Sequence, residues 1–257
     1  MGMLGKLFGR RFGAQTSAPS TRIPEGQRVY AIGDINGRAD LLRQLHDGIG
    51  ADLANAEPAE TTIIYLGDYV DRGLESRQVI DQLLANPVAG VNSVFLLGNH
   101  EAMLQGFRNG VREGMNWLYN GGNATLHSYG VRPPQGARGD QDLEEARAAF
   151  LEQLPATHAQ FFDDLRVCHE VGDYFFAHAG VQPGVPLHLQ TQEDMIWIRN
   201  EFLNSRQDFG KIIVHGHSIT PEIEETANRI GIDTGAYITG TLTALALEGG
   251  ERRYLST

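Results

Sequence analysis

The stretch RVYAIGDINGR, residues 28–38, decides how the rest of the sequence is interpreted. Its apolar run VYAI is rich in strand-forming residues and stops at Gly33, after which Asp34 and Asn36 follow two residues apart. Asp, Asn and Gly are the usual residues of turns, so a plain turn is one interpretation. The other is a strand that holds two chemically active side chains in a fixed place. The remainder of the chain has to decide between them.

Length and composition are those of an ordinary globular chain. The sequence has 257 residues, of which 41% are hydrophobic and 21% charged, and this suits one large domain. The formal net charge of -11 argues against a general nucleic-acid-binding surface. No apolar run approaches the roughly 20 residues that span a bilayer, and the single cysteine excludes an intramolecular disulfide. We expect a cytoplasmic protein that binds no nucleic acid and does not insert stably into membranes.

The first 24 residues differ from the rest in composition. They are basic and rich in Gly, Ser and Pro, and they lack the continuous apolar core of a signal peptide. We expect residues 1–24 to be a flexible basic leader, with a weak membrane-surface contact as the alternative. Residues 25–257 are expected to form a single domain.

Short apolar runs alternate with helical patterns through this domain. Helical spacing appears in residues 41–53 and 74–86, and residues 101–165 are mostly helical in pattern. The strand-like runs are VYAI (29–32), TIIYL (62–66), SVFLL (93–97), YFFA (174–177), IIV (212–214) and TLTALAL (241–247). Strands that alternate with helices predict an α/β fold with much parallel pairing.

Potential metal ligands follow the first five of these runs. In chain order they are Asp34 with Asn36, Asp68 with Asp71, Asn99 with His100, His178, and His215 with His217. The carboxyl ends of strands in an open α/β sheet line the crevice where ligands bind. Turns alone would supply Asp, Asn and Gly, whereas histidine is not a favoured turn residue. Asp, Asn and His without thiolates suit divalent ions such as Mn²⁺, Fe²⁺, Zn²⁺ or Mg²⁺, and Asp68 is the candidate for a carboxylate that bridges two of them.

The motifs GDxxG, GDxVDRG, GNHE, HAG and GH occur in this order between Val29 and Leu247. They resemble those of the phosphoprotein phosphatase family of metallophosphoesterases, in its compact bacterial and phage branch. The resemblance implies the calcineurin-like metallophosphoesterase fold, a four-layer α/β/β/α sandwich with a dinuclear metal site at the carboxyl ends of the strands. It makes residues 25–257 the catalytic domain and implies two divalent ions as cofactors. Mn²⁺ is the expected ion, with Fe, Zn and Mg as the other candidates.

The resemblance also assigns roles to the matching positions. The implied metal ligands, with Asp68 bridging, are Asp34, Asn36, Asp68, Asn99, His178 and His217. His100 would protonate the leaving alcohol as general acid, with Asp71 orienting its ring. The groups implied to bind the phosphate of the substrate are Arg72, Arg199, Asn99 and His100.

The implied activity is removal of phosphate from phosphoserine and phosphothreonine, with phosphotyrosine as a further substrate, by in-line attack of a metal-bridging hydroxide. Phosphorylated proteins and small phosphoesters are the expected substrates. Hydrolysis of dinucleoside polyphosphates is the first alternative, but the enzymes that carry it out tend to lack the acidic residue of VDRG, which is present here as Asp71. A protein that binds phosphate with little turnover is the second alternative.

Asn36 is the departure from the family pattern, which has histidine at this position. An amide oxygen is a harder and weaker donor for transition ions than a ring nitrogen. Three interpretations stay open: an active enzyme with a weakened first metal site that prefers Mn²⁺ or Mg²⁺, a strongly impaired catalyst, or a phosphate-binding protein. All the other expected residues are present, and this favours catalysis.

Several further residues have weaker signals. Trp117, Trp197 and Phe95 are interpreted as core residues. Asp233 follows a short apolar run and either orients a metal-bound histidine or belongs to a turn. Residues 120–122 either form a lid turn near the substrate or an ordinary loop.

Overall fold

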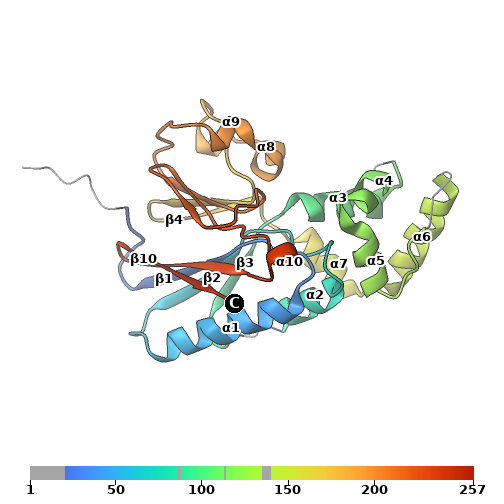
Figure 1. The fold of residues 1–257 in the computed structure, drawn as a ribbon, viewed down its shortest axis with the longest axis horizontal. Coiled ribbons are helices and arrows are strands. Elements are labelled where there is room, and N and C mark those ends of the chain that lie inside the picture. The colour runs from blue at the N-terminus through green and yellow to red at the C-terminus, as the bar shows by residue number, and fades with distance from the viewer. Residues whose placement is uncertain (1–20, 86–87, 113, 135–139) are drawn as a thin grey trace, which may run out of the picture.

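Two β-sheets lie face to face at the centre of the molecule, and helices cover both of their outer surfaces (Figure 1). The computed structural model describes residues 21–85, 88–112, 114–134 and 140–257. In this part of the chain the first sheet has five strands in the order β10-β9-β1-β2-β3. The second sheet also has five, in the order β4-β5-β6-β8-β7.

Each sheet contains three neighbouring parallel strands. The strands of the first sheet are β1 (Gln27–Ile32), β2 (Glu60–Tyr65), β3 (Asn92–Phe95), β9 (Thr243–Glu248) and β10 (Glu251–Ser256). Those of the second are β4 (Cys168–Val171), β5 (Tyr174–Ala177), β6 (Ile212–His215), β7 (Glu224–Glu225) and β8 (Arg229–Gly231). Strands β1, β2 and β3 are parallel, as are β5, β6 and β8, whereas β4, β7, β9 and β10 pair antiparallel.

The helices fall into three groups (Figure 1). On the side of the first sheet are α1 (Ala39–Ala54), α2 (Ser76–Leu84), α3 (Asn99–Asn109), α7 (Ala156–Asp163) and α10 (Ala236–Thr239). The second sheet is covered by η2 (Leu187–Leu189), α8 (Gln192–Trp197) and α9 (Asn200–Leu203). A helical lobe consists of α4 (Gly114–Trp117), the π-helical turn η1 (Leu118–Gly122), α5 (Asn123–Ser128) and α6 (Asp140–Gln153).

Alternating side chains of each strand enter two different cores, and this explains the continuous apolar runs in the sequence. Tyr30 and Ile32 of β1 belong to the core beneath the helices of the first sheet, whereas Val29 and Ala31 belong to the core between the two sheets. In β5, Phe175 packs in a third core with α8 and α9. The chain therefore has the expected four-layer α/β/β/α arrangement.

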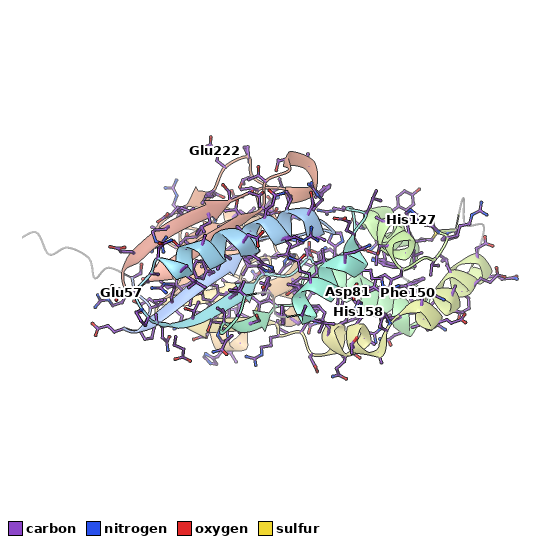
Figure 2. The ribbon with its side chains drawn as sticks, turned by 90° about the horizontal axis from the view of Figure 1, so that it is seen from below. Glu57, Asp81, His127, Phe150, His158 and Glu222 are labelled. Carbon is purple, nitrogen blue, oxygen red and sulfur yellow. The ribbon has the colours of Figure 1, made fainter. Side chains whose placement is uncertain are left out.

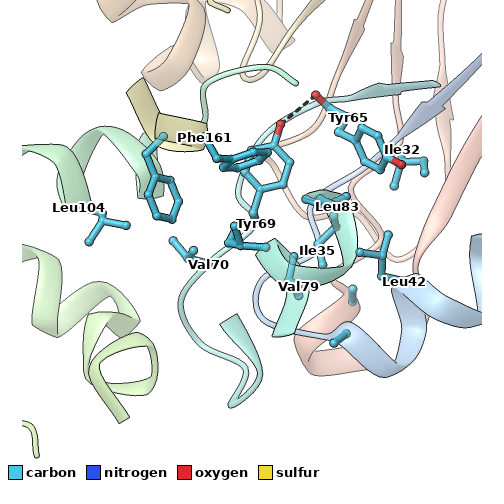
Figure 3. Packing of buried hydrophobic residues seen from close by; sticks show 14 of the residues in the cluster. Ile32, Ile35, Leu42, Tyr65, Tyr69, Val70, Val79, Leu83, Leu104 and Phe161 are labelled. Carbon is cyan, nitrogen blue, oxygen red and sulfur yellow. Dashed lines mark hydrogen bonds between the residues drawn. The ribbon is translucent and has the colours of Figure 1, made fainter. Parts of the chain in front are cut away.

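The loop after β2 is fixed by a buried tyrosine. Tyr69 packs edge-on against Phe161 of α7, with 5.4 Å between the ring centroids (Figure 3). Its hydroxyl donates to the carbonyl oxygens of Leu96 at 2.7 Å and Tyr65 at 3.3 Å. Because Tyr69 follows Asp68 directly, this anchor fixes the backbone that carries the Asp68 carboxylate.

The expected leader lies largely outside the described residues, which begin at residue 21. Ile23 is buried in the core between the sheets, and its N–H donates to the carbonyl of Gly249 at 2.9 Å. The packed part of the domain thus includes residues before position 25. None of the helices in the described ranges is both long enough and apolar enough to cross a membrane.

Candidate active site

Loops from both sheets bring the predicted site residues to one edge of the sandwich. Asp34 and Asn36 follow β1, the segment 68–72 follows β2, and Asn99 and His100 begin α3 after β3. His178 follows β5 and His217 follows β6, so the second sheet contributes the two imidazoles predicted as metal ligands. All of these residues except Arg72 are buried, although most of them are polar or ionisable. Such a concentration of buried polar groups requires partners or a bound ion.

Four of the predicted ligand atoms converge on one point. His178 Nε2 lies 2.9 Å from Asn99 Oδ1, 3.2 Å from His217 Nδ1 and 3.4 Å from Asp68 Oδ1. His217 Nδ1 lies 2.8 Å from Asn99 Oδ1. The carboxylate and both imidazoles can offer one atom each within 4.8 Å of one another. The donors come from four separate loops, so this convergence is a property of the fold.

The two imidazoles of this cluster are in the state that metal binding needs. His178 Nδ1 lies 2.9 Å from the carbonyl oxygen of Leu66, to which it donates, and this leaves the Nε2 lone pair directed at the cluster. Burial lowers the pKa of His178, and burial together with His178 lowers the pKa of His217 to about 2. The positive charge of Arg199 lowers both values further. Both rings are therefore neutral near pH 7, as metal ligands must be.

A second group of acidic side chains lies next to this cluster. Burial, followed by the charges of Asp233 and Asp68, raises the pKa of Asp34 well above its usual value. The backbone N–H of His217 donates to both Asp34 oxygens at 3.1 Å. Gly216 permits this approach, because a Cβ at that position would lie 2.1 Å from Asp34 Oδ1. A divalent cation would offset the repulsion among these carboxylates.

His100 and Asp71 form a buried pair beside the cluster. His100 Nδ1 lies 2.7 Å from Asp71 Oδ2, and both side chains are fully buried. Burial lowers the pKa of His100, but Asp68 and Asp71 outweigh it and raise the pKa to about 9. His100 Nε2 is buried without a hydrogen-bond partner among the described residues and lies 3.8 Å from Asp68 Oδ2. The pair thus holds a proton-donating nitrogen next to the predicted metal ligands.

Two arginines lie at the mouth of the site. Arg72 stacks over the ring of Tyr237 at 4.7 Å, and its Nη1 donates to Asn36 Oδ1 at 3.3 Å. The Asn36 amide nitrogen donates to the carbonyl of Val70 at 3.2 Å, so both ends of this amide have protein partners. Arg199 is exposed, and its Nη1 donates to Ser218 Oγ at 3.4 Å.

The backbone is unusual at the site. Among the described residues, the non-glycine residues with positive φ are Asn36, Asp68, Asp71, Arg72 and His217. Every one of them is a residue that the sequence predicted for the site. Left-handed conformations are uncommon for non-glycine residues and tend to occur at functional positions. The backbone thus marks the same place as the side chains.

The sequence from residue 27 to residue 238 matches the family described as calcineurin-like phosphoesterase. The chain belongs to this family. Among similar curated proteins, serine/threonine-protein phosphatase 2 of Salmonella typhimurium is 28% identical over 229 residues, which cover 84% of this chain and 91% of that protein. Serine/threonine-protein phosphatase 2 of Escherichia coli is 27% identical over 240 residues, which cover 88% of this chain and 97% of that protein. The chain is accordingly an enzyme of the metallophosphoesterase class.

Solved structures of other phosphoesterases share the fold. A crystal structure described as a candidate diadenosine tetraphosphatase has a TM-score of 0.58 and 21% identity, covering 90% of this chain and 94% of that one. A cold-active protein tyrosine phosphatase has a TM-score of 0.59 and 18% identity, covering 93% and 81%. At these identities the likeness concerns the fold, and the calcineurin-like fold expected from the sequence is confirmed.

The sequence did not identify every residue that shapes the site of this phosphoesterase. Glu101 accepts hydrogen bonds from the backbone N–H groups of Asp68, Tyr69, Val70 and Gly98, at 2.8–3.2 Å. Glu101 is the last residue of the GNHE motif, so its place in that motif was the one feature of the sequence that could have pointed to it. Trp117 is buried as expected for a core residue, but its Nε1 also donates to Asp71 Oδ2 at 2.9 Å. An apolar pattern predicts burial of an indole and not the partner of its N–H, so this contact had no signal in the sequence.

Proposed function

We propose that this phosphoesterase is a metal-dependent phosphomonoesterase that acts on phosphoserine and phosphothreonine, and also on phosphotyrosine. The observation that carries the proposal is the buried Asp71–His100 pair, which leaves His100 Nε2 free beside the cluster of predicted metal ligands. The serine/threonine phosphatases among its relatives support the same reaction class. We further propose residues 25–257 as the catalytic domain and a cytoplasmic location, which the bacterial relatives and the single cysteine support.

The residues present fit divalent ions. Ligand atoms about 2.1 Å from an ion lie roughly 3.0–3.4 Å apart in octahedral or tetrahedral coordination, and the separations around His178 Nε2 are 2.9, 3.2 and 3.4 Å. We assign Asp68, Asn99, His178 and His217 to one ion, and Asp34, Asn36 and Asp68 to the other. Mn²⁺ suits this mixture of oxygen and nitrogen donors, with Fe, Zn and Mg as alternatives. When bound, such ions supply a water of lowered pKa and neutralise charge on the phosphoryl group.

The remaining residues account for binding and proton transfer. Arg72 and Arg199 bind phosphate oxygens, because a planar guanidinium matches two of them at once. His100 protonates the leaving oxygen from Nε2. Asp71 holds the His100 ring through Nδ1 and so keeps the proton on the side of the substrate.

Asn36 separates the interpretations of the first metal site. Its Oδ1 accepts from Arg72, so the atom proposed as a metal ligand also contacts the phosphate-binding arginine. We propose an active enzyme whose first site binds its ion more weakly than a site with histidine at this position. The intact Asp71–His100 pair and both arginines support catalysis over a purely phosphate-binding role.

Three substrates test the proposal, each assayed with added Mn²⁺: p-nitrophenyl phosphate, a phosphoserine peptide and diadenosine tetraphosphate. Asp68→Asn is the matched control, because it keeps the shape of the side chain and removes the charge of the bridging carboxylate. We expect the wild-type chain to release phosphate from the first two substrates and Asp68→Asn to lose this activity. Preferential release of ADP from the third would instead establish a dinucleoside polyphosphate hydrolase. Phosphate binding without turnover of any substrate would establish a binding protein.

A further inference from the structure

Asp71 is bound by the helical lobe as well as by His100. Its Oδ2 accepts from His100 Nδ1 at 2.7 Å and from Trp117 Nε1 at 2.9 Å. Its Oδ1 accepts from Thr125 Oγ1 at 2.6 Å. Trp117 is the last residue of α4 and Thr125 lies in α5, so two side-chain donors to this buried carboxylate come from residues 114–128.

The packing of the lobe leaves these donors little freedom. The indole of Trp117 is fully buried and packs against Phe107 and Phe150, with ring centroids 4.7 and 6.3 Å away. Phe150 belongs to α6 and lies among the helices of the lobe (Figure 2). Gly122 closes over the other side, because a Cβ there would lie 2.5 Å from the indole ring. The Trp117 N–H is thereby fixed in its direction toward Asp71.

Thr125 holds the backbone of Asp71 as well as its carboxylate. Its Oγ1 lies 2.9 Å from the Asp71 backbone N–H, from which it accepts, and 3.0 Å from Ser76 Oγ. The same segment reaches the next residue too, since the Arg72 N–H donates to the carbonyl of Gly121 at 3.3 Å. Both Asp71 and Arg72 have left-handed backbones, with φ of 72° and 66°. Contacts from the lobe hold these two residues in that conformation together with Ser76 of α2, whose Oγ also accepts from the Asp71 N–H at 3.0 Å.

We propose that Trp117 and Thr125 are positioning residues for proton transfer to the leaving group. They act through Asp71: two fixed donors prevent its carboxylate from rotating, and the fixed carboxylate orients His100 Nε2 toward the leaving oxygen. This inference rests on the phosphomonoesterase function proposed above. In that reaction an oxygen derived from water forms a new bond to phosphorus, and the bond between phosphorus and the leaving oxygen breaks. The electron pair of the broken bond goes to the leaving oxygen, which takes the proton from His100 Nε2. A displacement of about 1 Å in such a group costs on the order of 100-fold in rate.

The basicity of the leaving group distinguishes this role from a merely structural one. p-Nitrophenolate is weakly basic and leaves without a proton, whereas phenolate is much more basic and depends on the acid. Phenyl phosphate and p-nitrophenyl phosphate share the aryl ring and the phosphate, so they differ mainly in this dependence. A poorly oriented His100 therefore slows phenyl phosphate selectively.

The experiment compares kcat and KM for both substrates in the Mn²⁺-loaded full chain and in Trp117→Phe, which keeps an aromatic ring and removes the N–H. We expect kcat for phenyl phosphate to fall about 10- to 100-fold, with little change for p-nitrophenyl phosphate and in either KM. Leu45→Ala is the control for stability, because it opens a cavity beneath α1 and leaves the indole, its packing and its N–H in place. It should lower thermal stability and leave the ratio of the two kcat values at the wild-type level.

A second pair of variants keeps the test decisive if Trp117→Phe does not fold. Thr125→Val removes the hydroxyl at nearly constant shape, and Thr125→Ser retains it. We expect a selective loss with phenyl phosphate in the valine variant and recovery in the serine variant. Equal losses for both substrates, or no loss, in an active protein would overturn the inference alone. A wild-type chain that hydrolyses neither substrate would overturn the proposed function and this inference with it.

Discussion

Left-handed backbone conformations at the site have a cost in stability. His217, Asp71 and Arg72 have φ of 62°, 72° and 66°, and such strained residues cost on the order of 1–3 kcal/mol each. Each is held by a specific contact: the His217 N–H donates to the Asp34 carboxylate, the Asp71 N–H to Thr125 Oγ1, and the Arg72 N–H to the carbonyl of Gly121. The strain is concentrated where side chains from different loops must meet at one point. These backbone conformations bring the site side chains together and lower the stability of the fold.

Replacing Asn36 with histidine should strengthen the first metal site. An imidazole nitrogen is a better donor to Mn²⁺ than an amide oxygen, so less metal is needed. We expect the Mn²⁺ concentration for half-maximal phosphatase activity to fall at least about tenfold. Substitutions of residues that only hydrogen-bond to metal ligands already change metal affinity by about that factor, and a direct ligand should have no smaller effect. Asn55→His, at an exposed position after α1, is the control and should leave the titration unchanged. Coinciding curves for Asn36→His and the wild type would show that residue 36 is not a ligand.

His46 of α1, which is not one of the predicted site residues, makes the fold sensitive to acid. Burial lowers its pKa from 6.5 to about 4, although Asp47 acts in the opposite direction, and its Nε2 lies 2.9 Å from the Tyr65 hydroxyl. Because the pKa is lower in the folded state, the unfolded chain takes up the proton first as the pH falls. The stability that His46 preserves is complete above pH 6.5 and is lost progressively down to about pH 4.

Urea unfolding at pH 7 and pH 5 measures this effect. We expect His46→Gln to lose less stability between the two pH values than the wild type, by about 2 kcal/mol. Effects of acid on the carboxylates and on bound metal are common to both proteins and cancel in the comparison. An identical pH dependence in the two would exclude His46 as the source.

At the level of elements, the junction between β2 and α3 depends on one carboxylate. Glu101, in the first turn of α3, accepts from four backbone N–H groups that belong to the loop after β2 and to Gly98. Gly98 itself has to be glycine, since a Cβ there would lie 2.2 Å from Asp68 Oδ1. The Asp68 carboxylate is thus positioned by the helix that also carries Asn99, another of the proposed metal ligands.

Glu101→Gln should loosen this junction. The amide places an NH₂ group against N–H donors and leaves part of the set unsatisfied, which costs about 1–3 kcal/mol. We expect this loss in the free energy of unfolding, together with weaker Mn²⁺ binding in calorimetric titrations. Glu144→Gln, on the exposed face of α6, is the control. Unchanged stability in Glu101→Gln would show that the junction does not depend on this charge.

The sequence predicted the elements that are buried on both faces better than those at the edges. The run YFFA coincides with β5, and the other apolar runs overlap β1, β2, β3, β6 and β9. Strand β10, with the sequence ERRYLS, is exposed at four of its six positions and rich in charge, so no apolar run marks it. Strands β7 and β8 are only two and three residues long and give too little pattern.

The same limit applies to the site. Motif residues such as Asp68 and His178 could be predicted because strand ends share an edge of a sheet. The contacts of Trp117 with Asp71 and of Tyr237 with Arg72 join segments that are distant in the chain. These two contacts depend on how the helical lobe and α10 pack against the rest of the chain. Local hydrophobic periodicity and short motifs do not reveal that packing.

For the whole molecule, the proposed metal ligands come from both sheets. Asp34, Asp68 and Asn99 come from loops of the first sheet, whereas His178 and His217 come from the second. An ion held by both groups of ligands binds the folded chain and not the unfolded one. Metal binding should therefore stabilise the entire sandwich.

Thermal unfolding with and without Mn²⁺ measures this linkage. At a metal concentration 100 times the dissociation constant the gain is about 2.7 kcal/mol, which corresponds to an increase in Tm of roughly 5–10 °C for a chain of this size. Asp68→Asn should remove most of the increase. An equal increase in the variant would place the stabilising ion elsewhere.

Anomalous diffraction at the manganese edge, from a crystal soaked in Mn²⁺, tests most directly whether the proposed ligands bind divalent ions. We expect a strong peak surrounded by Asp68, Asn99, His178 and His217, and a weaker one between Asp68 and Asp34. A crystal whose anomalous peaks all lie away from these residues, or that shows none at saturating metal, would contradict this expectation.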